Sequence, residues 1–255
     1  MTSDPLAVIG VVTWCFAVAL AGGLVGLVLG NIRLPVILLA ASSPSTGAGA
    51  NIGISGVAAA AASIVHIRAG RVNWRLFGWM APPSMAGAVA GGFLAGLVAD
   101  DVLLAVIGVT LLYFGVDLLR PKGEGPAPRA SNGEHTLDVR AAVLTGAGIG
   151  LLGGLVGLIL GALRMPALLR YVGETPHRAV GTNLTVGVCV GAAGVIGHSP
   201  EGLDWELLAI GSAASVPGAL IGSRLTGRLS PAALLRVIGA VLVVAGAATL
   251  AQALL

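Results

Sequence analysis

The sequence predicts an all-α polytopic membrane protein with two inverted-topology repeats. The whole chain has about eight full spans, plus a broken or half helix in each repeat. Composition is the first observation: 56 % of the 255 residues are hydrophobic, 10 % are charged, and the mean hydropathy is +0.97. About a quarter of the residues of a soluble protein are charged, so these values argue against a large soluble core. The second observation is an internal duplication, and the third is the charge of the loops.

A duplicated segment defines the two repeats. Residues 22–39 read GGLVGLVLGNIRLPVILL and residues 153–170 read GGLVGLILGALRMPALLR, with eleven identical pairs among eighteen. Each copy places an arginine, Arg33 or Arg164, inside an apolar run, as in transporters built from two repeats. The predicted domains are a first transmembrane repeat at 1–120, a hydrophilic linker loop at 121–140 and a second transmembrane repeat at 141–255.

Eight apolar runs reach the roughly 20 residues that a helix needs to cross a bilayer. They occupy positions 6–29, 46–66, 76–98, 101–119, 141–162, 179–197, 206–227 and 231–254. Glycines recur four residues apart in several runs, which suits close helix packing in lipid. The first run lacks the basic region of a cleaved signal peptide, and we interpret it as a retained helix.

The charge of the loops indicates the number of passes in each repeat. With four passes per repeat, seven basic loop residues lie on each side of the membrane. With five passes, thirteen lie on one face, and only Arg164 remains on the other, where six acidic residues gather. Short cytoplasmic loops are enriched in Lys and Arg, so five passes and inverted repeats are favoured. We therefore expect a multi-pass protein of the cell (inner or plasma) membrane, with short termini on the non-cytoplasmic side.

The additional pass in each repeat is too short for a complete helix. The apolar stretches after the two arginines, 34–41 and 165–169, contain eight and five residues. Each is expected to be half of a broken helix or an unwound segment. Such backbone is tolerated at membrane depth where it is buried in protein or lines a cavity. These segments are therefore where we expect the transport pathway.

Arg33 and Arg164 are the first candidates for substrate binding. An arginine within a bilayer is costly unless it is paired or faces water, and its planar guanidinium suits oxyanions. Inverted repeats would bring the two arginines to one site near a pseudo-two-fold axis. The alternative is that both lie at the interface, where they extend to lipid headgroups or bind carbonyls at a helix end.

Two asparagines lie in small, mildly polar runs of matched spans. Asn51 falls within STGAGANIGIS and Asn183 within VGTNLTVG. Their amides either orient the substrate or link helices by hydrogen bonds. The weaker companions in these runs are Thr46, Ser55, Thr182 and Thr185.

The remaining polar residues support neither an enzyme nor a cofactor. His66 and His198 end matched spans, where they either relay protons or anchor a helix end. Cys15 and Cys189 are interpreted as small buried hydrophobic residues, and no metal site is predicted. The sequence contains no H-E-x-x-H motif and the spans contain no acid pair, so an intramembrane enzyme is disfavoured.

The expected partners are a small anionic substrate and the lipid bilayer. Basic residues are confined to short loops, which argues against nucleic acid despite a net charge of +3. Asp117 lies one turn before Arg120 and is most simply its partner or a charge at the level of the lipid headgroups, and no other acid falls inside a span. Sodium or a cationic substrate is therefore poorly supported, and no pattern indicates an oligomeric state.

The order of these motifs resembles the sulfite exporter TauE/SafE family. The second half combines a Gly-rich helix ending in proline, AVGTNL at 179–184, and a span ending in histidine before GLDW at 202–205. The first half repeats this order with GAGANI, His66 and GRVNW at 70–74, so the resemblance covers roughly 10–250. It implies a prokaryotic-type inner-membrane permease for sulfite, sulfoacetate and other small organosulfonates. The family's usual run of glycines before the proline is replaced here by LGNIRLP and LGALRMP.

The predicted function is that of a permease or exporter. It moves a small anion, sulfite or an organosulfonate, by alternating access at a site between the two repeats. The alternatives are a carrier of another small anion such as a carboxylate, and a non-transporting membrane partner or assembly protein.

Overall fold

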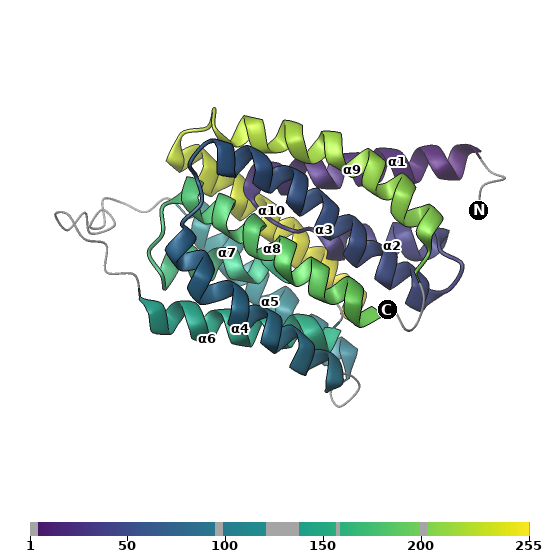
Figure 1. Cartoon of the computed structure of the whole chain (residues 1–255), viewed down its shortest axis with the longest axis horizontal. Helices are drawn as coiled ribbons and strands as arrows, with labels where there is room; N and C mark the ends of the chain where they lie inside the picture. Colours follow the sequence, from purple (N-terminus) through teal and green to yellow (C-terminus); the bar gives the residue numbers. More distant parts are fainter. Residues whose placement is uncertain (1–4, 95–98, 121–137, 157–158, 199–202, 255) are drawn as a thin grey trace.

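The computed structural model describes residues 5–94, 99–120, 138–156, 159–198 and 203–254, and these residues form ten α-helices and no strand (Figure 1). The first half contributes α1 (Pro5–Val25), α2 (Gly30–Ala40), α3 (Pro44–Arg68), α4 (Trp74–Phe93) and α5 (Asp100–Leu119). The second half contributes α6 (Val139–Val156), α7 (Gly161–Arg170), α8 (Pro176–His198), α9 (Trp205–Thr226) and α10 (Pro231–Ala253). Most of the predicted linker at 121–140 lies outside the described residues.

Six of the described helices are long and apolar enough to cross a membrane, rather than the eight full spans expected. These are α1, α3, α5, α8, α9 and α10. Helix α4 has a sufficient length but carries Arg75, Pro82 and Pro83, which reduce its hydropathy. Helix α6 belongs with the shorter apolar helices. The protein is therefore an all-α multi-pass membrane protein in which α4 is less apolar than a typical span and α6 is shorter than one.

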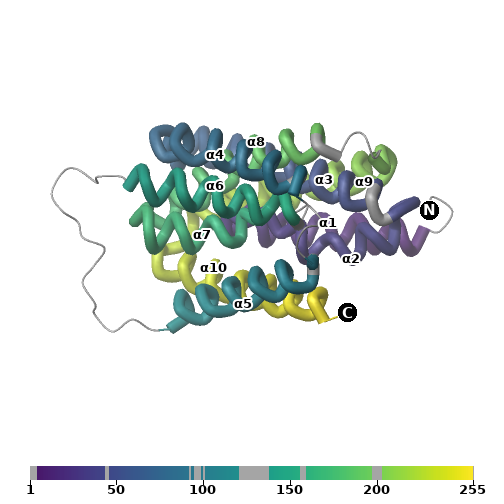
Figure 2. The backbone as a smooth tube through the Cα atoms, turned by 90° about the horizontal axis from the view of Figure 1, so that it is seen from below, coloured from purple at the N-terminus to yellow at the C-terminus, as the bar shows by residue number. Residues whose placement is uncertain are grey.

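The path of the chain reverses between the two halves. The start of α1 and the end of α10 lie at one end of the molecule, whereas α5 ends and α6 begins at the opposite end (Figure 2). Each half thus finishes at the end opposite to its start, as an odd number of passes requires. The end at which α5 finishes also holds the α3–α4 and α9–α10 junctions (Figure 1), and we call it the arginine-rich end. Its described basic residues include Arg68, Arg71, Arg75, Arg120, Arg140, Arg170, Arg178, Arg224 and Arg228.

The two halves interlock instead of folding separately. Helix α1 packs against α9, and its counterpart α6 packs against α4, the counterpart of α9. Helix α3 packs against its own counterpart α8, and α5 packs against α10. Exchanging the two halves therefore maps the main helix pairs onto themselves, which is the pattern of an approximate two-fold axis.

Matched glycines form the two equivalent crossings. A Cβ atom at Gly222 of α9 would lie 2.1 Å from the carbonyl oxygen of Leu20 in α1. A Cβ atom at Gly91 of α4 would lie 2.2 Å from the carbonyl oxygen of Leu151 in α6. Only glycine permits these backbones to touch, so the duplicated glycines serve helix packing.

The short helices are half-helices, as the sequence predicts. Helix α2 has 11 residues and α7 has 10, which corresponds to about 15 Å each. Between α1 and α2 the chain is non-helical at 26–29, and Gly26 has a φ of +72° that favours glycine. Both helices begin before the arginines, so each arginine is the fourth helical residue rather than a residue preceding the helix.

Interior prolines and charges on these half-helices have specific partners. Pro35 has no N–H to donate to the carbonyl of Asn31, and the side-chain Nε2 of Gln252 in α10 donates to that carbonyl instead, at 3.0 Å.

At the end of α7, Arg170 forms an ion pair with Asp117 of α5. The expected pairing of Asp117 with Arg120 is therefore wrong, because tertiary packing brings α7 beside α5.

Candidate functional site

Arg33 lies in the first turn of α2 and is almost completely buried, with 2 % of its surface exposed. Its Nε donates to Oδ1 of Asn51 at 2.9 Å, and its Nη2 donates to the backbone oxygen of Asn51 at 2.9 Å. Nη2 also donates to the hydroxyl of Ser55, one turn further along α3. Arg33 therefore fastens the half-helix α2 to α3.

Arg164 occupies the matching position in α7 and is 1 % exposed. Its Nη1 donates to Oδ1 of Asn183 in α8 at 3.1 Å. Its Nε is buried and has no hydrogen-bond partner among the described residues. The position that matches Ser55 is Gly187, so no hydroxyl is available here. Arg164 consequently retains a buried donor that Arg33 has satisfied.

The asparagines hold the first residues of the half-helices. Nδ2 of Asn51 donates to the carbonyl of Gly30 at 3.1 Å, and Nδ2 of Asn183 donates to that of Gly161 at 2.9 Å. Asn183 also donates to the carbonyl of Gly26 at 2.7 Å, in the non-helical segment of the other half. Asn183 therefore connects the α7–α8 cluster to the break between α1 and α2.

Both clusters are electropositive. The N-terminus of a helix carries a partial positive charge, and neither half-helix has a side-chain cap at its N-terminus. The described ion pairs, Arg170–Asp117 and Arg178–Glu174, leave Arg33 and Arg164 without a carboxylate. A buried cation without a counterion is costly, so an anion would be stabilised at either guanidinium.

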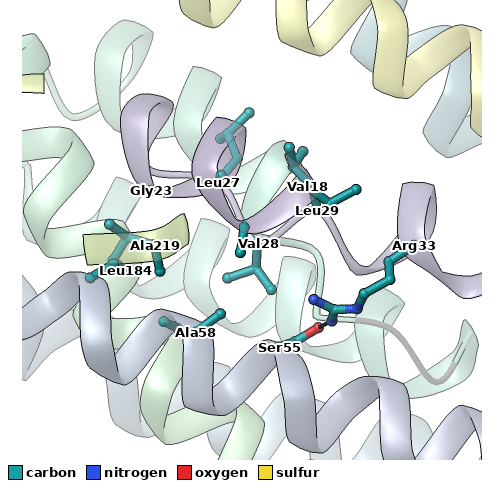
Figure 3. Close-up of a pocket in the computed structure, with 14 residues that line it drawn as sticks. Val18, Gly23, Leu27, Val28, Leu29, Arg33, Ser55, Ala58, Leu184 and Ala219 are labelled. Carbon is teal, nitrogen blue, oxygen red and sulfur yellow. Dashed lines mark hydrogen bonds between the residues drawn. The ribbon is translucent and has the colours of Figure 1, made fainter. Parts of the chain in front are cut away.

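A small cavity of about 20 Å³ adjoins Arg33 (Figure 3). Arg33 points toward Ser55 at its polar end, and the remaining wall is formed by small and aliphatic residues of α1, α3, α8, α9 and the non-helical segment 26–29. This volume holds about one water molecule, so a larger anion enters only after helices separate. Arg164 does not line this cavity, and each arginine binds the asparagine of its own half.

Two predicted threonines lie outside these clusters. Thr182 is buried, and its hydroxyl accepts from the backbone N–H of Asn73 at 2.9 Å, at the arginine-rich end. Thr46 belongs to the first turn of α3, where its N–H donates to the cap residue Ser43 at 3.3 Å. Thr185 donates to the carbonyl of Gly181 within its own helix. Of the weaker candidates, only Ser55 contacts an arginine.

The two predicted histidines end α3 and α8. His66 is fully buried, and neither ring nitrogen has a hydrogen-bond partner among the described residues. The side chain of His198 lies outside the described residues. His66 therefore is a buried polar group that the Arg–Asn clusters do not use.

Sequence reasoning missed one polar cluster next to the site. Nδ2 of Asn31 donates to the hydroxyl of Thr249 at 2.7 Å, which links α2 to α10 across 218 positions. Gln252 binds the carbonyl of the same residue. Thr249 and Gln252 are three residues apart in an apolar span, so they share a helix face, and this spacing was the available signal.

These features place the chain among multi-pass membrane transporters with broken helices rather than among enzymes. The chain belongs to the sulfite exporter TauE/SafE family, whose model matches residues 11–249. The resemblance inferred from the motifs is thereby confirmed.

Two relatives cover most of the chain. One is the probable membrane transporter protein y4hK of Sinorhizobium fredii (strain NBRC 101917 / NGR234), 26 % identical over 222 residues, with 85 % of this chain and 88 % of the relative covered. The other is the probable membrane transporter protein YjnA of Bacillus subtilis (strain 168), 25 % identical over 244 residues, with 88 % and 94 % covered. No solved structure matches the chain significantly.

Proposed function

We propose that this transporter moves a small anion, sulfite or an organosulfonate, by alternating access at a site between two inverted repeats. One observation carries the proposal. Matched arginines are buried in the first turns of two half-helices, each bound to a matched asparagine, and neither has a carboxylate partner in the described ranges.

The donors at this site favour an oxyanion. Guanidinium N–H groups and helix N-termini both bind oxygen atoms that carry negative charge. Arg164 contributes a buried Nε that needs an acceptor. Asn51 and Asn183 each bind both the guanidinium and the carbonyl of the first residue of the half-helix. A substrate with an ammonium group would find no described carboxylate here, which favours sulfite over the zwitterion taurine.

Alternating access would use the symmetry of the helix pairs. The crossings α1–α9 and α4–α6 are equivalent, so opening one while the other stays packed exposes the site to one side only. Under this proposal eight long helices and the two half-helices make five passes per repeat. The arginine-rich end would face the cytoplasm, and both termini the opposite side.

Transport into proteoliposomes tests the proposal. We expect the wild-type protein to carry sulfite and the double variant Arg33→Gln, Arg164→Gln to carry it at least about tenfold more slowly, because each lost charged hydrogen bond costs about 1.5–3 kcal/mol. Arg236→Gln changes an exposed arginine of α10 and is the matched control. Thiosulfate, sulfoacetate, taurine and small carboxylates complete the panel.

Two results would contradict the proposal. Equal sulfite flux in the double variant and the control would show that transport does not require the two arginines. If a carboxylate is carried faster than every sulfur oxyanion, the protein is still an anion carrier, but its substrate is a carboxylate.

A further inference from the structure

The C-terminus of α3 fixes His66 beside Arg71. Gly70 adopts a φ of +66°, a conformation that favours glycine and turns the chain back over the last helical turn. The N–H of Arg71 consequently donates to the carbonyl of His66 at 2.9 Å. A Cβ atom at Gly181 of α8 would lie 2.2 Å from the carbonyl oxygen of Arg71, so close packing against α8 holds this turn in place.

His66 and Arg71 both present buried polar atoms without partners. The two ring nitrogens of His66 and Nη1 of Arg71 have no hydrogen-bond partner in the part of the chain described. His66 is 0 % exposed, and buried polar groups in folded proteins are almost always paired. The unpaired Nη1 of Arg71 beside the imidazole N–H of His66 therefore indicates a missing acceptor.

The surroundings of this pair are cationic. The charged neighbours of His66 are Arg71 and His177 of α8, and the backbone of Gly23 in α1 also lies near its ring, outside hydrogen-bond geometry. The guanidinium of Arg71 packs on Gly227 at the end of α9, where a Cβ atom would lie 3.0 Å from Nη2. The same helix end and the loop after it carry Arg224 and Arg228.

The nearby acid does not neutralise this charge. Glu174 precedes α8, accepts from Nδ2 of Asn73, and lies 3.8 Å from Nε of Arg178. His177 is also engaged, since its Nε2 lies 3.1 Å from the carbonyl oxygen of Leu229. The N–H of the His66 imidazole and Nη1 of Arg71 remain as unpaired donors, and an anion is the acceptor that suits their cationic surroundings.

His66 lies on the same face of α3 as the cavity at Arg33. Ser55, Ala59, Ala62 and His66 are separated by four, three and four residues, which places them along one helix face. Ser55, Ala59 and Ala62 line the cavity, opposite the small residues Gly22 and Gly23 of α1. The rise of α3 from Ser55 to His66 is about 16 Å, so this face leads from the cavity at Arg33 toward the arginine-rich end, although His66 does not line the cavity itself.

We propose that a ring nitrogen of His66 and Nη1 of Arg71 form a second anion subsite, which exchanges the anion between the arginine-rich end and Arg33. This inference rests on the function proposed above. The second repeat has no equivalent arginine, because its loop at 199–206 contains three acids and no basic residue except His198 at its edge. The subsite therefore occurs once, and the two ends of the pathway differ.

Sulfite uptake by proteoliposomes with sulfite supplied at the arginine-rich end tests the subsite. We expect Arg71→Gln to raise the KM for sulfite about tenfold, the effect of losing one charged hydrogen bond, with the maximal rate within about twofold. His66→Leu should act in the same direction, and Arg71→Lys should restore part of the affinity. Arg68→Gln, which changes an exposed arginine of the same turn, is the control and should leave KM unchanged.

A second readout separates this inference from the proposed function. Sulfite titration of purified protein, followed by calorimetry, should show a binding step that Arg71→Gln removes and the double variant Arg33→Gln, Arg164→Gln retains. If wild-type binding is lost in the double variant but KM is unchanged in Arg71→Gln and His66→Leu, the subsite is overturned and the proposed function stands. If the wild-type protein neither binds nor carries any anion, both fail.

Discussion

At the scale of single residues, the two halves have unequal hydrogen-bond networks around equal arginines. Arg33 has three acceptor contacts, to two atoms of Asn51 and to Ser55. Arg164 has one described acceptor, Oδ1 of Asn183, and an unpaired Nε. The asparagines differ in the opposite sense, because Asn183 donates to two carbonyls and Asn51 to one. The second repeat therefore depends more strongly on its asparagine.

This asymmetry predicts a difference in stability. Asn183→Leu removes the described partner of Arg164 and the described donor to the carbonyl of Gly26, which lies outside any helix. Asn51→Leu leaves Arg33 bound to a backbone carbonyl and to Ser55. Each buried group left unpaired costs about 1–3 kcal/mol. We expect the melting temperature of the detergent-purified protein to fall further for Asn183→Leu than for Asn51→Leu. Equal melting temperatures would contradict the assigned network.

The sequence singled out the arginines and asparagines of the two candidate clusters, but not most of their hydrogen-bond partners. A charge in an apolar run and its exact recurrence identified Arg33 and Arg164, and duplication identified the asparagines. The bond from Asn183 to Gly26 joins positions 157 apart, and that from Asn31 to Thr249 joins positions 218 apart. Hydropathy and periodicity describe neighbours within one helix, so such tertiary bonds are invisible to them.

At the scale of elements, the half-helices and the glycine crossings give the bundle its shape. Short apolar stretches beside the arginines predicted the half-helices, because length alone excludes a full span. Length and an apolar majority also predicted α4 and α6 as full spans, but neither is among the six described helices that are long and apolar enough. In α4, Arg75 and two prolines lower the hydropathy. Those residues sit in a helix that packs closely against α6 and α8, so protein contacts replace part of the lipid contact.

The crossing of α1 and α9 is expected to tolerate no added side chain. In Gly222→Ala the new Cβ would lie 2.1 Å from the carbonyl oxygen of Leu20, so the helices must separate, at a cost of about 1–3 kcal/mol. Gly10→Ala is the control in α1, because nothing lies within 4 Å of its Cβ position. Thermal unfolding of both variants measures the difference. A Gly222→Ala protein as stable as the control would show that the helices do not touch there.

At the scale of the whole molecule, the approximate two-fold axis and the charge distribution describe one arrangement. The helix pairs map onto themselves when the halves are exchanged, and the ends of α5 and α10 lie at opposite ends of the molecule (Figure 2). Basic residues gather at the end where the halves join, and the starts of α5 and α9 at the other end carry Asp101, Asp204 and Glu206. An odd number of passes accounts for both features, since it inverts the second half and exchanges the charge of matched loops.

This arrangement predicts that the linker at 121–140 and the C-terminus lie on opposite sides of the membrane. With five passes per repeat and the arginine-rich end in the cytoplasm, a green fluorescent protein inserted in the linker fluoresces, because it folds in the cytoplasm. The same reporter after Leu255 stays dark, whereas alkaline phosphatase fused there is active outside the cytoplasm. Four passes per repeat would give both positions the same reporter signal, because the chain would return to its starting side after each half. The linker insertion and the terminal fusion are thus controls for each other, and matching signals would refute the inverted repeats.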